Sequence, residues 1–179
     1  ADVISGDANP GGKLPFTIAC NDSDYPPFLH IADNKHEIDY GYYHGYTLFD
    51  KKNIEPQYPF GFGLSYTDFE LSGYSVKQKE DSVSVTVTVK NIGSVCGDEV
   101  VQVYVSSTNT AEDRPVKLLK GFRRVSVDAG ETVTAEIEIS VEDIMFYNAE
   151  NGSWSADSDY DILVGTNSRN AVSAGKIHF

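Results

Sequence analysis

Apolar and polar residues alternate with a period of two in a series of short segments between about residue 66 and residue 179. The clearest segment is 82–90, where four valines alternate with serine, threonine and lysine. This period puts successive side chains on opposite faces of a β-strand, so that one face is buried and the other is solvated. The same reasoning predicts strands at 69–76, 100–105, 118–125, 132–139, 160–165 and 171–177.

Short strands at regular spacing, with turn-forming residues between them, predict the fold class. They favour a mostly-β fold, an antiparallel two-sheet sandwich of the immunoglobulin or fibronectin type III kind. The Cys…Trp…Cys spacing of a true immunoglobulin domain is absent from the sequence. The sequence therefore predicts a fibronectin type III-like sandwich over residues 66–179.

Residues 1–65 have a different character. Glycines and a proline crowd residues 6–12, and residues 21–54 show no sustained periodicity. Leu14–Ile18 is a candidate short edge strand, because proline is tolerated at sheet edges. A stretch this long without periodicity is uncommon in a compact domain unless it wraps another body or lines a site. We therefore expect an irregular, wrapping segment before the sandwich.

Residues 55–67 join the two regions and combine aromatic rings, prolines and glycines. Pro59 lacks a backbone donor, and Gly61 and Gly63 permit backbone conformations that other residues avoid. The segment fits neither a helix nor a regular strand. We expect its rings to hold it as a clamp between the two regions.

Charge and composition exclude several functions. The net charge is −13 and the pI is about 4.5, which disfavours nucleic acid and anionic lipid as partners. No apolar run reaches the length of a membrane span. Cys20 and Cys96 are expected to be free thiols, with a bridge left open, and the sequence does not assign a cellular compartment.

No catalytic or metal site can be assembled from the sequence. The carboxylate pairs Asp157/Asp159, Glu112/Asp113 and Glu142/Asp143 stand beside turns, where solvated loop charges are expected. The histidines lack metal-ligand spacing, so we predict neither a metal nor a cofactor. Trp154 is expected to plug one end of the sandwich core.

Residues 40–46, the aromatic loop, are the densest cluster of rings in the chain and the one candidate binding site. Tyr42, Tyr43 and His44 are the candidate substrate-binding residues, because aromatic rings pack on the apolar faces of sugars. The alternative, which we favour, is that these rings anchor the loop to a neighbouring domain. For His44 we favour a hydrogen-bonded structural role over a ligand contact.

Several motifs together resemble the C-terminal portion of family 3 glycoside hydrolases, the β-glucosidases and β-xylosidases. The resemblance covers essentially the whole chain, and the order of the motifs makes it specific. The motifs are Gly6-Asp7-x-Asn9-Pro10-x-Gly12-Lys13-Leu14-Pro15, Pro59-Phe60-Gly61-Phe62-Gly63-Leu64-Ser65-Tyr66-Thr67-x-Phe69, Asn91-x-Gly93, Gly97-x-Glu99-Val100-Val101-Gln102-Val103-Tyr104-Val105 and Arg114-Pro115-x-Lys117-x-Leu119-Lys120-Gly121-Phe122.

The resemblance implies that residues 1–65 are the tail of an α/β-sandwich domain with a wrapping linker, and that residues 66–179 are the fibronectin type III-like domain. It implies a retaining mechanism with a carboxylate nucleophile and a carboxyl acid/base. In relatives these groups lie on a (β/α)₈ barrel and upstream in the α/β-sandwich. No catalytic residue is therefore carried over to this chain. Tyr40 and Thr47 depart from the glutamate and arginine of the family's aromatic-loop motif, so any ion pair between those two is lost.

The sequence thus predicts a non-catalytic part of a retaining β-glycosidase, most specifically a β-glucosidase acting on terminal β-linked sugars. The expected partners are a carbohydrate substrate and the missing barrel and α/β-sandwich domains, in the same polypeptide or as a second chain. This chain would brace those domains. The alternative is a free-standing fibronectin type III-like module that binds carbohydrate or protein.

Overall fold

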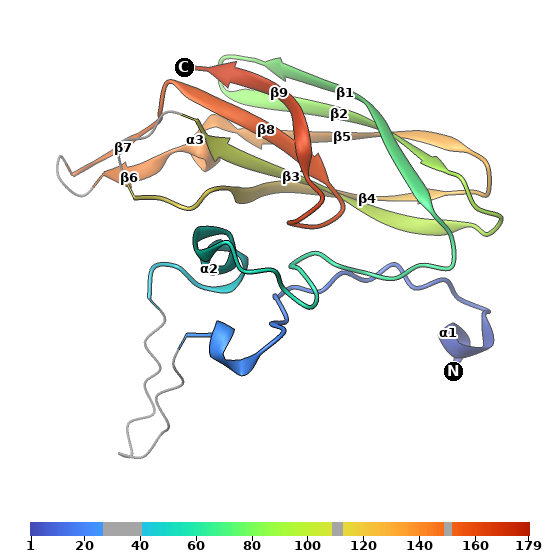
Figure 1. Ribbon diagram of the computed structural model, residues 1–179. Helices are drawn as coiled ribbons and strands as arrows, with labels where there is room; N and C mark the ends of the chain where they lie inside the picture. The colour runs from blue at the N-terminus through green and yellow to red at the C-terminus, as the bar shows by residue number, and fades with distance from the viewer. Residues whose placement is uncertain (27–40, 109–112, 149–151) are drawn as a thin grey trace.

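The computed structural model describes residues 1–26, 41–108, 113–148 and 152–179. Two antiparallel sheets stack as a sandwich, and an irregular N-terminal segment, residues 1–68, runs along one side of it (Figure 1). The predicted antiparallel β-sandwich is confirmed. The extent of the two domains stays a prediction.

The sandwich has a three-stranded sheet in the order β1-β2-β5 and a four-stranded sheet in the order β4-β3-β8-β9. Its seven strands are the seven that the sequence predicts, with shifted ends. They are β1 Phe69–Gln78, β2 Ser82–Asn91, β3 Gly97–Ser107, β4 Leu118–Val127, β5 Thr132–Ser140, β8 Asp159–Gly165 and β9 Val172–His178.

The core lies between the sheets and follows the alternation read from the sequence. The four alternating valines of β2 are fully buried, and Val83 pairs with Ile139 and Val87 with Ala135 on β5. Burying one such side chain stabilises the fold by about 1.5–3 kcal/mol. The register is fixed by this pattern, because a slip by one residue would turn the valines to solvent.

A short insertion between β5 and β8 was not predicted. It comprises α3 Val141–Ile144 and a hairpin of β6 Phe146–Asn148 and β7 Ser153–Ser155. Strands of three residues carry too little alternation to be recognised. Trp154 lies on this hairpin, 64% exposed, with its ring 5.9 Å from that of Tyr147. The prediction that Trp154 plugs the core was wrong; Ile144 and Tyr160 are the buried side chains from this part of the chain.

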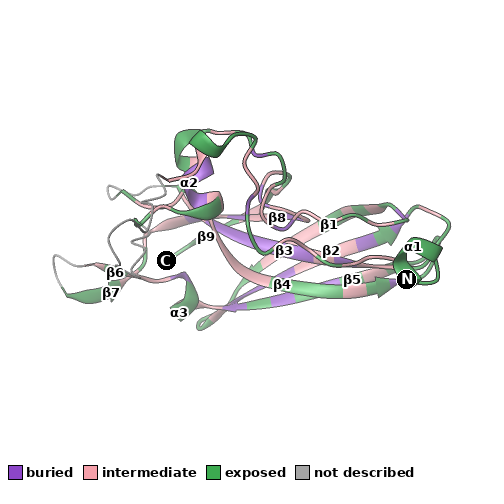
Figure 2. Cartoon of the chain, turned by 90° about the horizontal axis from the view of Figure 1, so that it is seen from below, coloured by how far each residue is buried: buried purple, intermediate pink, exposed green. Residues whose placement is uncertain are grey.

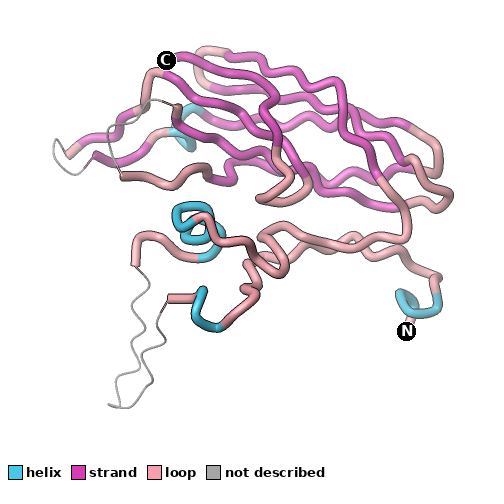
Figure 3. The backbone as a smooth tube through the Cα atoms, in the orientation of Figure 1, coloured by secondary structure: helices cyan, strands magenta, loops and turns pink. Residues whose placement is uncertain are grey.

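The N-terminal segment is mostly loop (Figure 3). Among its described residues, 1–26 and 41–68, the regular elements are α1 Asp2–Ser5, the 3₁₀ turn η1 Asp22–Asp24 and α2 Gly45–Lys52. The candidate edge strand is reduced to one bridge, Ile18 with Tyr58, extended by a hydrogen bond from Leu14 N to Phe62 O. Pro15 lacks the backbone donor that a longer ladder would need.

The junction residues 55–67 contact both the rest of the N-terminal segment and the β-sandwich, as a clamp would. The N–H of Gly61 donates to Leu14 O, and the N–H of Ser168, between β8 and β9, donates to Phe60 O. Gly61 has φ 81°, and a Cβ there would lie 2.3 Å from Gln102 Oε1 of β3. A Cβ on Gly63 would lie 2.4 Å from the carbonyl oxygen of Gly12. Both glycines are therefore required for close approach of the backbone.

Candidate functional site

Helix α2 holds the aromatic loop against the outer face of the four-stranded sheet. The N–H of His44 donates to Thr47 Oγ1, and the Thr47 hydroxyl donates to His44 O, which fixes the start of the helix. Asn53 ends the helix in the left-handed conformation. Leu48 and Phe49 are buried, and the ring of Phe49 lies 6.2 Å from that of Tyr25; Figure 2 shows buried positions within α2.

Sequence reasoning missed this helix. The buried residues Thr47, Leu48 and Phe49 are consecutive in a helix of eight residues, so no helical period of apolar residues emerges in the sequence. A signal was present at its C-terminus, where Lys51 and Lys52 precede Asn53. Basic residues in the last turn followed by asparagine are typical of a helix end.

Asp50 is the main electrostatic contact between α2 and the sandwich. Its carboxylate lies 2.6 Å from Lys117 Nζ and 3.1 Å from Arg169 Nη1. Arg169 also donates to Ile54 O, just beyond the helix. Lys117 precedes β4 and Arg169 lies between β8 and β9, so one buried anion joins three separate parts of the chain.

Tyr46 connects the helix to the sheet through its ring and its hydroxyl. The ring lies 4.9 Å from Phe60 and 6.0 Å from Tyr104, and the hydroxyl accepts from Leu119 N. Burial raises the pKa of Tyr46, so it is a neutral phenol at ordinary pH. The Tyr104 hydroxyl donates to Gln102 Oε1, so the polar groups beneath the helix are paired.

The structure places the three candidate sugar-binding residues at different depths. Tyr43 is partly buried and its hydroxyl donates to Asp113 Oδ1 at 2.7 Å, while Lys51 pairs with the same carboxylate. These hydrogen bonds from Lys51 and Tyr43 lower the pKa of Asp113. Tyr42 is exposed and meets Tyr43 edge to face at 5.0 Å. His44 is the exposed N-cap residue of α2.

A groove of about 680 Å³ opens beside this loop. Its walls include Phe16, Tyr42 and Tyr46, with His44 and Gly45 at the N-terminus of α2. Apolar walls with a few polar groups are typical of ligand sites and also of docking surfaces. Whether Tyr42, Tyr43 and His44 contact a sugar there stays a prediction.

Thr17, which also lines the groove, has an unusual hydroxyl. Its side chain is buried, and Oγ1 has no hydrogen-bond partner among the described residues. The backbone oxygen of Thr17, by contrast, accepts from the hydroxyl of Tyr25. Buried polar atoms are nearly always paired, so this hydroxyl needs an explanation.

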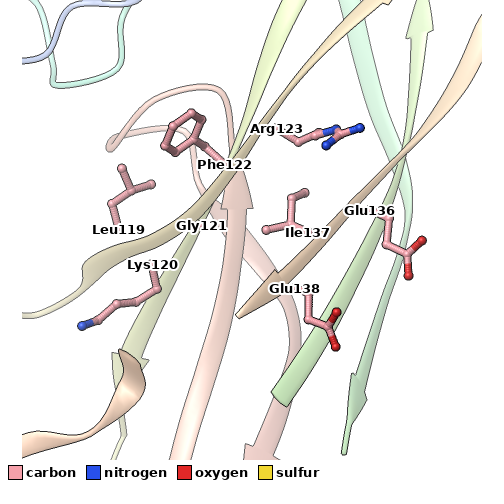
Figure 4. A pocket seen from close by; sticks show the side chains of 8 residues that line it. All are labelled: Leu119, Lys120, Gly121, Phe122, Arg123, Glu136, Ile137 and Glu138. Atoms are coloured by element: carbon pink, nitrogen blue, oxygen red, sulfur yellow. The ribbon is translucent and has the colours of Figure 1, made fainter. Parts of the chain in front are cut away.

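A second hollow, of about 390 Å³, lies where β4 and β5 meet at the open side of the sandwich. Figure 4 shows Phe122 on the opposite side of the strands from Glu136 and Glu138. A Cβ on Gly121 would lie 2.6 Å from Ile137 Cγ2, so glycine lets the two sheet edges approach. Glu138 is held by Lys79 and Ser82. We interpret this hollow as a feature of sheet packing.

The carboxylates were predicted to be solvated loop charges, which is wrong for Asp157. Its side chain is largely buried and pairs with Arg114, and Ser107 Oγ also donates to it. Arg114 lies over the ring of Phe146, 3.6 Å from its centroid. Asp159, in contrast, has a partly exposed side chain that lies 3.0 Å from His178 Nδ1. These carboxylates thus take part in structural contacts, and Glu112 lies outside the described residues.

The described part of the chain offers no metal site and no membrane span. It holds no group of three or more histidine, cysteine or acidic side chains placed to bind an ion. His30, His36 and Tyr40 lie outside the described residues. No helix in the described ranges is long and apolar enough to cross a bilayer. Cys20 and Cys96 are both free and exposed, as expected.

Comparison with known proteins identifies the class of both regions. The model of the glycosyl hydrolase family 3 C-terminal domain matches residues 1–66, and that of the fibronectin type III-like domain matches residues 99–168. The chain is 39% identical over 179 residues to thermostable beta-glucosidase B of Acetivibrio thermocellus, covering 96% of this chain and 24% of that protein. It is 40% identical to a beta-glucosidase of Kluyveromyces marxianus, covering 97% of this chain and 21% of that protein.

The solved structures agree with this assignment. The crystal structure of the beta-glucosidase from Kluyveromyces marxianus in complex with glucose superposes with a TM-score of 0.89 at 37% identity, covering 99% of this chain and 22% of that one. The chain belongs to the family 3 glycoside hydrolases and corresponds to a C-terminal portion of them. It spans less than a quarter of the length of these relatives.

Proposed function

We propose that the chain is the non-catalytic C-terminal part of a β-glucosidase that releases terminal β-linked glucose. Its relatives are named beta-glucosidases, and one of them holds glucose. The other domains of the parent, including a barrel that carries the nucleophile, would supply the two carboxyl groups of a retaining mechanism. The role of this chain is to brace those domains.

The observation that carries the bracing role is the Asp50 contact. Helix α2 belongs to the region that matches the family 3 C-terminal domain, whereas Lys117 and Arg169 belong to the sandwich. A buried anion between two cations resists relative movement, because separating them leaves uncompensated charge. The sandwich thus holds the α/β-sandwich tail in a fixed orientation.

The free-standing module is the less favoured alternative. Such a module would present residues 1–54 as a finished surface. Instead, Ile4, Phe16 and Leu64 have large exposed apolar side chains in the segment that includes the junction. Large apolar side chains exposed along one segment are consistent with a surface that another body covers.

The test is hydrolysis of an aryl β-glucoside by the purified chain, by the full-length parent, and by the chain mixed with the rest of the parent. The parent and the mixture are expected to turn over the substrate, and the chain alone is expected to be inactive. Turnover by the chain alone would overturn the proposal. In the parent, Tyr43→Ala separates a pure spacer from a sugar-contacting loop, because an unchanged kcat/KM indicates the spacer.

A further inference from the structure

We propose that the β6–β7 hairpin is an accessory binding site for a neutral chain of β-linked glucosyl units, formed by the rings of Tyr147 and Trp154. The identity of the sugar rests on the proposed function, whereas the site itself rests on the geometry of the hairpin. Neither residue lines the groove beside the aromatic loop. The site holds a sugar chain on the enzyme and takes no part in its chemistry.

The two rings lie on one outward face of the hairpin. Tyr147 and Trp154 stand directly opposite each other in the antiparallel pair, with ring centroids 5.9 Å apart. The neighbouring Phe146 points to the other face, where Arg114 lies 3.6 Å from the centroid of its ring. Figures 1 and 2 both show the hairpin at one end of the sandwich. One face of the hairpin is therefore anchored, and the other presents two rings to solvent.

Arg114 fixes both strands of the hairpin. Its guanidinium covers the ring of Phe146 on β6 and pairs with Asp157, which lies two residues beyond the end of β7. Ser107, the last residue of β3, also donates to Asp157. Both charged side chains are largely buried, so this pair resists separation. A surface that is fixed before its ligand arrives loses little conformational entropy on binding.

The ring-to-ring contact alone does not account for the exposure of the two side chains. Trp154 is 64% exposed and Tyr147 is 56% exposed, whereas tryptophan is largely buried in most folded proteins. The ring planes meet at 69°, edge to face. Such a contact covers only one side of one ring, so a large aromatic area remains open to a ligand.

The size of this surface favours a sugar over a protein. A fully covered aromatic side chain buries about 150–250 Å², so the exposed parts of these two offer at most about 300 Å². A stable protein–protein interface takes about 800 Å² from each partner. Among residues 141–148 and 152–155, the described part of the insertion, no other large apolar side chain is exposed. The surface is about the size of one or two pyranose rings and is too small to hold a second copy of the chain.

The chemistry of the surface favours a neutral β-linked glucan. Pyranose rings have apolar C–H faces that pack on aromatic rings, and a tyrosine hydroxyl can hydrogen-bond to a sugar hydroxyl. The net charge of −13 disfavours an anionic polysaccharide. The equatorial linkages of a β-linked glucosyl chain keep it extended and leave the faces of its rings accessible. The glucosyl identity itself comes from the proposed function.

Trp154 is the only tryptophan in the sequence, so its fluorescence reports on the site directly. Titrating the chain with cellohexaose is expected to shift the emission to shorter wavelength and to saturate, because the sugar displaces water from the indole. Maltohexaose, an α-linked chain of the same units, is the control and is expected to bind severalfold more weakly. No saturable shift with cellohexaose, or an equal response to maltohexaose, would overturn the proposal. A shift on raising the protein concentration without sugar would also overturn it, because a second copy would then cover the rings.

Substitutions test the two rings separately, with calorimetry as the measurement of affinity. Tyr147→Ala is expected to weaken the binding of cellohexaose severalfold, and Trp154→Ala to abolish measurable binding. Trp154→Tyr keeps an aromatic pair across the hairpin and is expected to restore weak binding, which separates a lost ring from a collapsed hairpin. Phe122→Ala is the matched control, because Phe122 is 66% exposed on β4, outside the hairpin. Unchanged binding by Trp154→Ala, no rescue by Trp154→Tyr, or equal weakening by Phe122→Ala would each overturn the proposal.

The full-length parent separates a failure of this site from a failure of the proposed function. Trp154→Ala is expected to leave kcat/KM for an aryl β-glucoside unchanged while the parent loses its retention in an affinity gel that contains soluble β-glucan. An active parent whose retention does not depend on Trp154 would overturn the site and leave the proposed function standing. A parent that is retained through Trp154 but lacks β-glucosidase activity would overturn the proposed function instead.

Discussion

The carboxylate of Asp50 lies 2.6 Å from the ammonium group of Lys117, across 67 residues of sequence. The Asp50 side chain is 3% exposed and that of Lys117 is 12% exposed. Ion pairs at the surface contribute little, whereas breaking a buried pair leaves a charge without compensation. This contact, shared with Arg169, determines how the N-terminal segment sits on the sandwich.

Replacing this anion tests its importance for stability. Asp50→Asn is expected to lower the free energy of unfolding by about 3 kcal/mol, because Lys117 and Arg169 lose their buried counter-charge. Urea denaturation of the two proteins measures the difference. The control is Asp113→Asn, which breaks the exposed pair with Lys51 and should change stability far less. Equal effects of the two substitutions would contradict a special role for Asp50.

Asn91 is expected to contribute to the stability of the sandwich about as much as Asp50 contributes at the α2 contact. Its Oδ1 accepts from Thr67 Oγ1, and its Nδ2 donates to Val95 O and Val127 O. Asn91→Ala is expected to lower the free energy of unfolding by about 2–4 kcal/mol, because several buried groups lose their partners. Lys90→Ala, at the exposed neighbouring position, should stay within about 0.5 kcal/mol in the same denaturation measurement. A neutral Asn91→Ala would show that water replaces these bonds.

The close approach at the junction depends on Gly61. Gly61→Ala places a methyl group where Gln102 lies and forces alanine into the left-handed region at φ 81°. A loss of more than about 1 kcal/mol is expected, with faster hydrogen exchange in residues 55–67. Gly12→Ala is the matched control, because nothing lies within 4 Å of its Cβ position. If both variants exchange at the parental rate, the clamp does not depend on this contact.

Acid should weaken the sandwich partly through Asp98. Hydrogen bonds from Ser126 and Arg124 hold the pKa of Asp98 below its ordinary value of 3.8. The folded-state pKa is therefore depressed, so the stabilisation is complete above the unfolded-state pKa and is lost as the pH falls through the folded-state pKa. Asp98→Asn is expected to flatten the dependence of the free energy of unfolding on pH below about pH 4. An unchanged slope between pH 5 and pH 2 would contradict this assignment.

The sandwich was predictable because its signal is local. Val83 and its alternate neighbours encode a buried face in consecutive residues, and the register with β5 follows from the same alternation. Helix α2 and the β6–β7 hairpin were not predictable, because each is too short for its period to show. Nothing in the sequence singled out Asp50, and Asp157 was interpreted as a solvated loop charge, because the partners of both lie far away in sequence.

The candidate site was only partly predictable. The density of rings marked the aromatic loop, but the sequence does not reveal that Tyr43 is engaged by Asp113 while Tyr42 remains exposed. The unpaired hydroxyl of Thr17 depends on the burial of a single atom, which no sequence pattern reports. The junction rings were expected to clamp the two regions together, and the structure leaves those of Tyr58 and Tyr66 partly open to solvent.

We propose that this chain braces a β-glucosidase without performing its chemistry. The initial rate of aryl β-glucoside hydrolysis tests this proposal when measured for the isolated chain, for the rest of the parent, and for a stoichiometric mixture of the two. We expect no turnover by the chain and a rate for the mixture well above that of the rest alone. Turnover by the isolated chain, or an equal rate with and without it, would show that the chain does not have this role.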